Sequence, residues 1–361
     1  MSDPNTIRIL EIDGGGERGY LSNSFLKLFV QLWGVDPGAL AKEFDVICGT
    51  SVGGMMALSL AHGLSLDQVN TFLTVQGPYI FSLTSLAPSV RPNLAAKIAL
   101  LLTNTPFYQS SGPTENEYGY GLLKTTLETQ FGTSTLQDLQ TNVIIPTYQE
   151  DKSRYILCSN LNYPEFTAQN ELISNVALAT GSAPIYLPPL IINNTTPGTL
   201  SGTYIDGGIY QNNPSSFGRT LAQMIKPTAS RCCVLSIGTG LGEMGFDPGN
   251  PDMVDSRVQH MTSRISQMDI DPTASIKFIF KLFDIASAGG QESVSKALDL
   301  ESKYTLNQLY YYRFQPILDP NVNTELDNTD PEILAYYDDV AKLTFDEDIE
   351  NIAAFLGHLT A

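Results

Sequence analysis

A serine between two glycines, in Gly49-Thr-Ser51-Val-Gly53, is the first group in this chain that could do covalent chemistry. A serine hydroxyl becomes a useful nucleophile only when it is exposed, oriented and relieved of its proton by a neighbouring base. A sharp turn from a strand into a helix meets the first two needs, because the glycines let the backbone close and the helix N-terminus favours negative charge. An apolar run at residues 44–48 precedes the motif, so we expect Ser51 at such a turn. The alternative is an ordinary turn whose serine caps the helix.

Three consecutive glycines follow another strand-like run, residues 7–12. The sequence there is Asp13-Gly14-Gly15-Gly16-Glu-Arg18-Gly19. Backbone N–H groups of such a loop, at the start of a helix, can hold an anion. We interpret the loop as a site for the oxyanion of a tetrahedral intermediate, with Arg18 bracing the loop or adding positive charge. A dinucleotide site is less compatible with it, because Asp13 would lie beside a pyrophosphate; a purely structural turn is the remaining alternative.

A carboxylate, Asp206, stands directly before Gly207 and Gly208, at the end of a third strand-like run at residues 203–205. Taken alone, this tripeptide is a common turn. Together with the other two motifs, it offers a candidate base for Ser51. The two residues are far apart along the chain, so only the fold can bring them into contact.

The histidines favour a carboxylate base over a histidine base. A Ser-His-Asp triad of the α/β-hydrolase kind needs its histidine after the acid, and only His260 and His358 come late enough. Neither follows an evident strand end. We therefore expect a Ser–Asp dyad and keep a triad esterase or acyltransferase, using His260 or His358, as an alternative. A non-catalytic module whose glycine loop binds an anion is the other alternative.

The three motifs, in this order, resemble those of the patatin-like phospholipases. Members of that family carry D-G-G-G-x-R/K-G after the first strand, then G-x-S-x-G, then D-G-G/A. Asn212-Asn213-Pro214 is similar to the family's usual continuation, and the resemblance spans about residues 7–220.

The resemblance implies a lipid acyl hydrolase of the phospholipase A or lysophospholipase type, independent of any metal or other cofactor. It implies a dyad of Ser51 and Asp206 and an oxyanion hole at residues 14–16. The supporting motif residues would be Gly19, Gly49, Gly53, Gly207 and Gly208. The substrate would be a phospholipid or lysophospholipid, met by transient contact with a membrane or micelle surface.

Strand, turn and helix alternate along the first part of the chain, which indicates parallel βαβ units. Strand-like runs lie at residues 7–12, 44–48, 142–148, 154–159, 203–205 and 234–237, and helical patterns at 52–61, 66–74 and 171–180. With the resemblance, this predicts a three-layer α/β/α fold with a mostly parallel central sheet and added C-terminal helices. We expect a catalytic core at residues 7–220. Residues 221–361 would add the last strand or strands and an acidic elaboration that is helical from about residue 250.

The charge of the chain excludes some partners. It has 38 acidic and 20 basic residues, for a formal net charge of −18, so we expect no nucleic acid partner, because phosphate backbones are repelled. Acidic residues accumulate between residues 319 and 350; a solvated face is the simplest interpretation, with autoinhibition or a partner site as the alternative. The proline-broken stretch at residues 79–102 is a candidate lid or interfacial patch, or else a buried helix.

The cysteines and the N-terminus bear on the compartment. Four cysteines, with no C-x-x-C spacing, predict buried reduced thiols and neither a disulfide framework nor a metal site. No run reaches the roughly 20 apolar residues of a membrane span, and the N-terminal sequence lacks signal-peptide features. We expect a cytoplasmic protein, or one exported without a cleavable signal peptide, that is peripheral on membranes when active.

Overall fold

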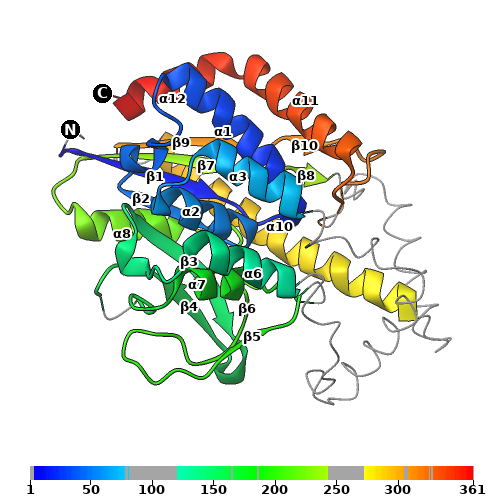
Figure 1. Ribbon diagram of the computed structural model, residues 1–361. Helices are drawn as coiled ribbons and strands as arrows, with labels where there is room; N and C mark the ends of the chain where they lie inside the picture. Colours follow the sequence, from blue (N-terminus) through cyan, green and yellow to red (C-terminus); the bar gives the residue numbers. More distant parts are fainter. Residues whose placement is uncertain are drawn as a thin grey trace.

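A fully buried strand, β1 (Thr6–Ile12), lies in the middle of the sheet of the computed structural model (Figure 1). β2 (Val46–Gly49) and β7 (Arg231–Ile237) flank it in parallel. β3 (Asn142–Gln149) continues the parallel arrangement beyond β2, and β9 (Gln308–Phe314) continues it beyond β7. The structure describes residues 4–77, 80, 120–163, 166–184, 187–242, 272–304, 308–324, 326 and 328–360.

The other side of the sheet is antiparallel. β3 pairs antiparallel with both β4 (Arg154–Cys158) and β6 (Gly202–Asp206), and β5 (Leu190–Ile192) pairs antiparallel with β6. A separate short parallel pair joins β8 (Leu241–Gly242) to β10 (Ile317–Leu318). The predicted α/β class with a central, mainly parallel sheet is therefore confirmed.

Helices cover both faces of the sheet. Since successive side chains of a strand point to opposite faces, β1 contributes to two separate cores. Leu10 and Ile12 of β1 belong to a core shared with one layer of helices, whereas Ile7 and Ile9 belong to a second core on the other face. The first layer contains α1 (Gly19–Trp33), α2 (Val52–His62), α3 (Leu66–Thr71), α6 (Tyr120–Phe131), α7 (Ile173–Gly181), α11 (Pro331–Glu347) and α12 (Ile349–Thr360); the second contains α8 (Ser215–Ile225) and α10 (Pro272–Tyr304).

The part of the chain after residue 250 is not purely helical, so the sequence-based expectation was wrong for β9. Leu309 and Tyr311 pack on the side of α8 and α10, whereas Tyr312 and Phe314 pack on the side of α1. Because both faces of β9 are covered, apolar and aromatic residues occur on both of them, and the strand lacks the alternation that marks a half-exposed strand. The C-terminal part thus supplies β7 and β9 to the sheet as well as helices.

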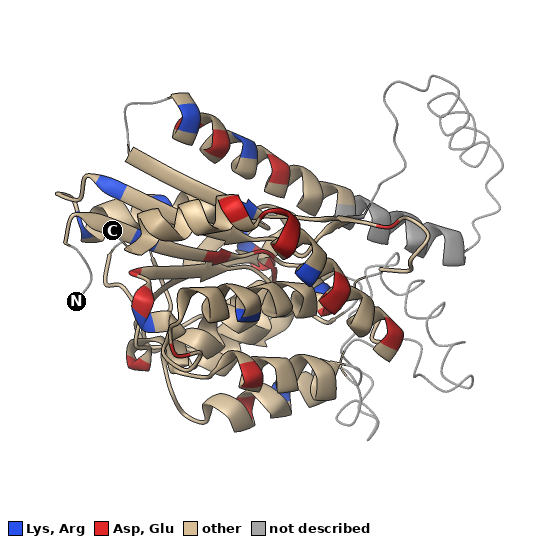
Figure 2. Cartoon of the chain, turned by 90° about the horizontal axis from the view of Figure 1, so that it is seen from above, with Lys and Arg blue, Asp and Glu red and all other residues tan. Residues whose placement is uncertain are grey.

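The acidic residues of α11 lie on its outer side. Glu332 and Asp339 are exposed, while Tyr337 and Phe345 are buried where α11 packs against α1. On α10 acidic and basic residues are interspersed (Figure 2), and Asp299 forms ion pairs with both Lys296 and Lys303. These charges therefore lie on solvated surfaces.

The remaining sequence-based predictions concern the state of the cysteines, the presence of a membrane-spanning helix and the candidate lid. All four cysteines are buried and free, as predicted. Across the part of the chain that the structure describes, no helix is both long enough and apolar enough to cross a bilayer. The candidate lid at residues 79–102, residue 80 excepted, and His260 lie outside the described residues.

Candidate active site

Ser51 lies in the sharp turn between β2 and α2, where the sequence predicts it. Its φ of 56° and ψ of −127° form a backbone conformation that residues other than glycine rarely adopt. The flanking glycines are needed for close approach: a Cβ on Gly53 would lie 2.1 Å from the carbonyl oxygen of Ile12, and one on Gly49 would lie 2.3 Å from that of Gly53. The turn therefore presents the half-buried Ser51 at the N-terminus of α2.

Asp206 is the last residue of β6 and is 1% exposed. Its amide donates to the carbonyl oxygen of Ser182 (2.9 Å), and its carboxylate accepts a hydrogen bond from the amide of Gly208 (2.7 Å). A Cβ on Gly207 would lie 2.5 Å from the carbonyl oxygen of Pro146, so this turn can pass β3 only as glycine. The two glycines thus let the carboxylate lie deep in the structure.

The structure brings Ser51 and Asp206 together, close enough for the Ser51 side chain to lower the pKa of the Asp206 carboxyl. Burial raises the pKa of Asp206 to about 7, while Ser51 and the hydrogen bond from Gly208 act in the opposite direction. An ordinary aspartate has a pKa of about 4 and is a weak base. Desolvation therefore makes the Asp206 carboxylate a better proton acceptor. The sequence alone did not reveal whether this carboxylate is desolvated.

The glycine loop lies against Ser51, since a Cβ on Gly14 would be 3.0 Å from the Ser51 Cβ. The carbonyl oxygen of Gly14 accepts three hydrogen bonds. They come from Asn212 Nδ2 (3.1 Å), Thr239 Oγ1 (3.0 Å) and Gln291 Nε2 (3.4 Å). In a trans peptide the next N–H points the opposite way from the carbonyl, so these donors fix the direction of the Gly15 amide.

The amides of the loop differ in their availability. The Gly14 amide donates to the carbonyl oxygen of Asn212 (3.3 Å). Among hydrogen bonds between described residues, none uses the amides of Gly15 or Gly16. Gly15 and Gly16 are therefore the predicted loop residues that can donate to an anion without giving up a partner.

Arg18 and Gly19 occupy the end of the loop and the start of α1. The Arg18 amide donates to the carbonyl oxygen of Gly15 (3.2 Å), which braces the loop through the backbone. The Arg18 guanidinium acts electrostatically on Tyr337 of α11, and no hydrogen bond between described residues joins it to Ser51 or Asp206. Gly19 gives room to Val52 of the turn. Arg18 thus supports the loop, and its charge faces α11.

The histidines lie elsewhere in the described part of the chain. His62 ends α2, eleven residues after Ser51, or about 16 Å along the helix. The His358 ring stacks on Tyr310 of β9 with centroids 3.8 Å apart. β9 is three strands away from β2, or about 14 Å at the usual strand spacing. Neither histidine can therefore act on Ser51 in this structure.

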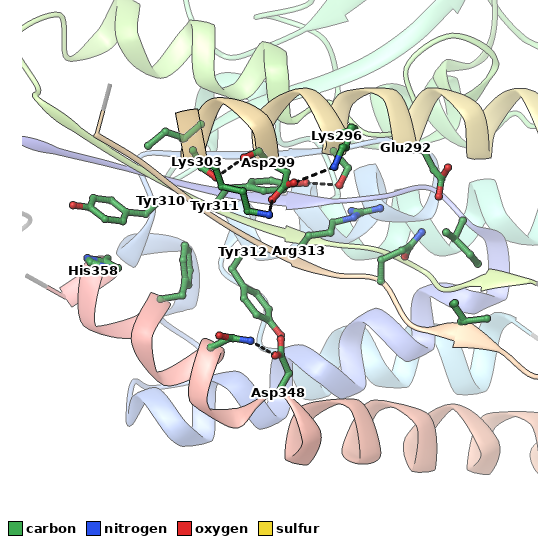
Figure 3. A pocket seen from close by; sticks show the side chains of 18 residues that line it. Glu292, Lys296, Asp299, Lys303, Tyr310, Tyr311, Tyr312, Arg313, Asp348 and His358 are labelled. Carbon is green, nitrogen blue, oxygen red and sulfur yellow. Dashed lines mark hydrogen bonds and ion pairs between the residues drawn. The ribbon is translucent and has the colours of Figure 1, made fainter. Parts of the chain in front are cut away.

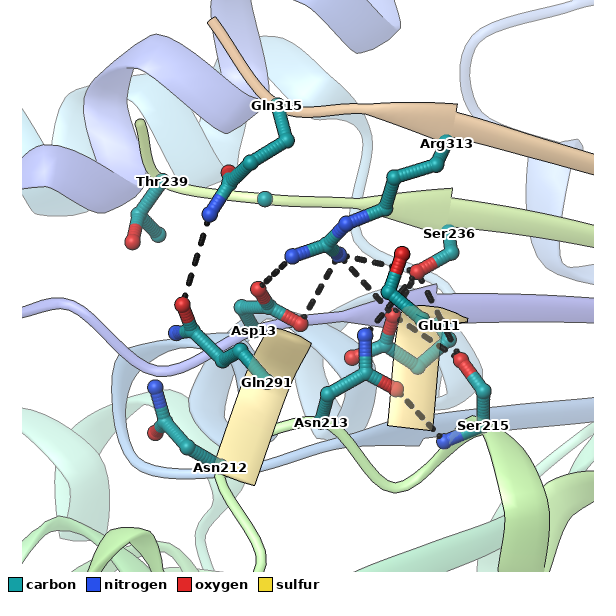
Figure 4. A network of polar contacts seen from close by, with 12 residues as sticks. Glu11, Asp13, Asn212, Asn213, Ser215, Ser236, Thr239, Gln291, Arg313 and Gln315 are labelled. Carbon is teal, nitrogen blue, oxygen red and sulfur yellow. Dashed lines mark hydrogen bonds and ion pairs between the residues drawn. The ribbon is translucent and has the colours of Figure 1, made fainter. Parts of the chain in front are cut away.

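A buried polar network beneath the glycine loop was not predicted from the sequence (Figure 4). Arg313 of β9 pairs with Asp13 through both guanidinium Nη atoms. Its Nη1 also donates to Ser236 Oγ (2.9 Å) and lies 3.6 Å from Glu11 Oε2. Burial, reinforced by the charge of Asp13, raises the pKa of Glu11 well above its usual value. The network therefore favours the neutral form of Glu11.

The Asn212-Asn213 pair connects the Asp206 turn to this network. Asn212 binds Gly14, while Asn213 Nδ2 donates to Ser236 Oγ (3.1 Å). The signal that could have revealed Arg313 is its type, because a lone basic residue inside an apolar strand needs a buried partner. Nothing in the sequence identified which partner.

An open pocket of about 910 Å³ lies beside β9 (Figure 3). Its lining residues come from α10, β9 and α12 and include Tyr310, Arg313 and His358. Neither Ser51 nor Asp206 lines it. No His, Cys, Asp and Glu cluster with metal-binding arrangement occurs among the residues described.

A protein-family model described as "Patatin-like phospholipase" matches residues 10–216. "Patatin-like protein 1" from Oryza sativa subsp. indica is 30% identical over 260 residues, covering 65% of this chain and 58% of the relative. A "cGAMP-activated phospholipase" from Vibrio cholerae is 30% identical over 250 residues, covering 66% of this chain and 65% of that protein. The chain thus spans about three fifths of the length of these curated relatives.

Solved structures give weaker likenesses. VipD from Legionella pneumophila aligns with a TM-score of 0.43 and 15% identity, over 96% of this chain and 68% of that one. Human GIVD cytosolic phospholipase A2, solved with methyl gamma-linolenyl fluorophosphonate, aligns with a TM-score of 0.44 and 12% identity, over 100% of this chain and 60% of that one.

Proposed function

The chain belongs to the patatin-like phospholipase family, and on this premise we propose that it is a lipid acyl hydrolase cleaving fatty-acyl esters of phospholipids or lysophospholipids. The observation that carries the proposal is the convergence of Ser51 and the buried Asp206, whose carboxyl lies within the electrostatic influence of the Ser51 side chain. The unused amides of Gly15 and Gly16 lie in the loop that packs against Ser51. A nucleophile, a base and oxyanion donors thereby share one site, as acyl transfer requires.

In the acylation half of the proposed reaction, Ser51 Oγ attacks the carbonyl carbon of the ester and its proton passes to Asp206. The carbonyl oxygen becomes an oxyanion that accepts hydrogen bonds from the Gly15 and Gly16 amides. Losing one such donor typically costs about 10² to 10³ in rate. The tetrahedral intermediate then collapses, the alcohol oxygen leaves with the proton from Asp206, and an acyl-Ser51 ester remains.

In the deacylation half, a water molecule gives a proton to Asp206 as its oxygen attacks the acyl carbon. The same two amides stabilise the second oxyanion. The bond between Ser51 Oγ and the acyl carbon then breaks, the proton returns to Ser51, and the fatty acid is released. Asp206 acts as base and then acid in each half, so its raised pKa serves both directions.

The chain's charge bears on how it would meet a lipid surface. A net charge of −18 disfavours attraction to anionic bilayers, so we propose transient, peripheral contact with zwitterionic membranes or micelles. We propose a cytoplasmic location for the protein, or export without a cleavable signal peptide. Fractionation of the native host, with and without added zwitterionic vesicles, tests both points.

Two variants test the proposed dyad. Ser51→Ala and Asp206→Asn should each abolish release of fatty acid from phospholipid and lysophospholipid vesicles, and Ser51→Ala should also abolish labelling by a fluorophosphonate probe. His62→Ala, His260→Ala and His358→Ala should retain activity, and EDTA should not reduce it. Loss of activity in the His260 variant would favour the triad alternative. Folded wild-type protein that is neither labelled at Ser51 nor hydrolytic would favour an anion-binding module.

A further inference from the structure

Arg313 lies outside the region matched by the family model, on the edge strand of the sheet. It is the sixth residue of β9, paired in register with Ser236 of β7. Its side chain is 11% exposed and points across β7 toward Asp13 at the end of β1 (Figure 4). A buried guanidinium loses its hydration, so specific hydrogen-bonding and charged partners must compensate for the free energy of that loss.

The partners form a fork on one carboxylate. Arg313 Nη1 donates to Asp13 Oδ1 (3.0 Å), and Nη2 donates to Asp13 Oδ2. Nη1 is fixed from the other side by Ser236 Oγ (2.9 Å). Asp13 is fully buried, so its carboxylate is paired with Arg313 and shielded from water. A two-point contact of this kind sets both the distance and the plane of the carboxylate.

Asp13 is the residue that begins the glycine loop. Its amide donates to the carbonyl oxygen of Ile237 (2.9 Å), so Asp13 is held at backbone and side chain by β7 and β9. The next residue, Gly14, carries a carbonyl oxygen that accepts hydrogen bonds from Asn212, Thr239 and Gln291. The amides of Gly15 and Gly16 follow within two residues. Their direction is therefore set by groups that converge from distant parts of the chain.

We propose that Arg313 is a positioning residue, whose fork on Asp13 holds the glycine loop so that the Gly15 and Gly16 amides point at the developing oxyanion. This inference rests on the proposed function of the site. Among the described residues, the hydrogen bonds and ion pairs of the Arg313 guanidinium go to Asp13, Ser236 and Glu11, and none goes to Ser51 or Asp206. Its effect on the reaction therefore has to pass through Asp13 and the loop.

The chemistry of the fork separates positioning from simple charge balance. Lysine keeps the positive charge but supplies a single ammonium, which cannot bind both carboxylate oxygens in one plane. A displacement of about 1 Å in a catalytic group can cost about 100-fold in rate. We therefore expect Arg313→Lys to lower kcat about 10- to 100-fold while KM for a soluble activated ester, such as p-nitrophenyl butyrate, changes less than about threefold.

A matched control is available on the same face of the sheet. Arg219 of α8 forms an ion pair with Glu301 of α10 and is similarly buried, with its side chain 14% exposed. That pair joins two helices and does not touch the glycine loop. Arg219→Lys should therefore leave kcat within about twofold of wild type, measured well below the midpoint of thermal unfolding for each variant.

A double variant separates stability from positioning. Asp13→Asn combined with Arg313→Gln removes both charges and so avoids an unpaired buried carboxylate. We expect it to recover thermal stability relative to Arg313→Ala, but not kcat. If kcat returns to within threefold of wild type together with stability, Arg313 contributes only to stability and the proposal is overturned.

Chemical rescue gives a readout that a merely structural residue would not move. The pocket of about 910 Å³ is lined by Arg313 (Figure 3), so a small cation can reach the space that Arg313→Ala vacates. Guanidinium ion, at concentrations well below those that unfold the protein, should increase the rate of fluorophosphonate labelling of Ser51 in this variant and not in wild type. Methylammonium, which lacks the fork, should do so less.

The outcomes distinguish this inference from the proposed function. Wild-type protein whose labelling and hydrolysis are lost in Ser51→Ala establishes the function whatever Arg313 does. On that background, Arg313→Lys with kcat within twofold of wild type would overturn the positioning role. If Arg313→Ala does not fold, Arg313→Lys and the double variant still decide the question, since neither leaves Asp13 as an unpaired buried charge.

Discussion

The backbone amide of Ser51 donates a hydrogen bond to the hydroxyl of Thr180 (3.0 Å), and that hydroxyl donates in turn to the carbonyl oxygen of Pro146 (2.7 Å). Thr180 belongs to α7 and Pro146 to β3, so two elements other than β2 and α2 hold the strained turn. A positive φ at a non-glycine residue costs on the order of 1–3 kcal/mol and persists only where its surroundings enforce it. Thr180 supplies that enforcement.

Thr180→Val is expected to weaken the turn, because valine keeps the shape of threonine but offers no acceptor for the Ser51 amide. Leaving a buried donor without a partner costs about 1–3 kcal/mol, so the free energy of unfolding should fall by that amount and kcat should fall with it. Thr180→Ser keeps the hydroxyl and should retain most of the activity. Equal unfolding midpoints and equal kcat for Thr180→Val and wild type would contradict this role of Thr180.

The pH dependence of ester hydrolysis should report Asp206. Burial raises its pKa to about 7, so below pH 7 the carboxyl is protonated and cannot accept the Ser51 proton. For a soluble uncharged ester, kcat/KM should fall about tenfold per pH unit at lower pH and become constant above about pH 8. An inflection near pH 4 would show that the carboxylate works without the effect of burial.

Two glycine substitutions should have opposite effects. A Cβ on Gly53 would lie 2.1 Å from the carbonyl oxygen of Ile12 and 2.4 Å from that of Asp13, both backbone atoms of the strand that carries the glycine loop. Gly53→Ala should therefore abolish activity and sharply reduce the yield of folded protein. Gly289 lies within α10, where an added Cβ would meet no atom of the described residues within 4 Å, so Gly289→Ala should leave activity unchanged and raise stability by up to about 1 kcal/mol. Circular dichroism and yield check both.

The motifs and the first βαβ units could be predicted because their signals are local. Ser51 and Gly53 lie in one turn, and the strand before them is short, apolar and followed at once by glycine. Asp206 needed more than its local sequence, since its turn is common and only the accompanying motifs gave it meaning. The pKa that suits it to act as a base comes from burial, which no spacing reveals.

The rest of the site depends on contacts between distant residues. Arg313 and Gln291 reach the glycine loop across 300 and 277 positions of the chain, and neither belongs to a motif. β9 was missed for a related reason: its two covered faces remove the alternation that would distinguish a strand from a buried helix. Thr180 could be predicted as the end of a helix, but not as the partner of Ser51.

Glu17 provides a test of stability that is independent of catalysis. It follows the glycine loop, is fully buried, and neither of its carboxylate oxygens has a hydrogen-bond partner among the described residues. Burial raises its pKa from 4.5 to about 8. Between those values the unfolded chain has lost the proton while the folded protein still holds it, so folding becomes less favourable as the pH rises.

Glu17→Gln removes this pH dependence, because glutamine stays neutral at every pH. Any cost of burying its amide is the same at pH 5 and pH 8, so the difference between the two pH values isolates the charge. From pH 5 to pH 8, the free energy of unfolding of wild type should fall relative to the variant by up to a few kcal/mol. Thermal or denaturant unfolding at both pH values measures this. Glu350→Gln, at an exposed position of α12, is the matched control and should follow wild type; a Glu17→Gln profile parallel to wild type would mean that Glu17 is ionised in the folded protein and paired there.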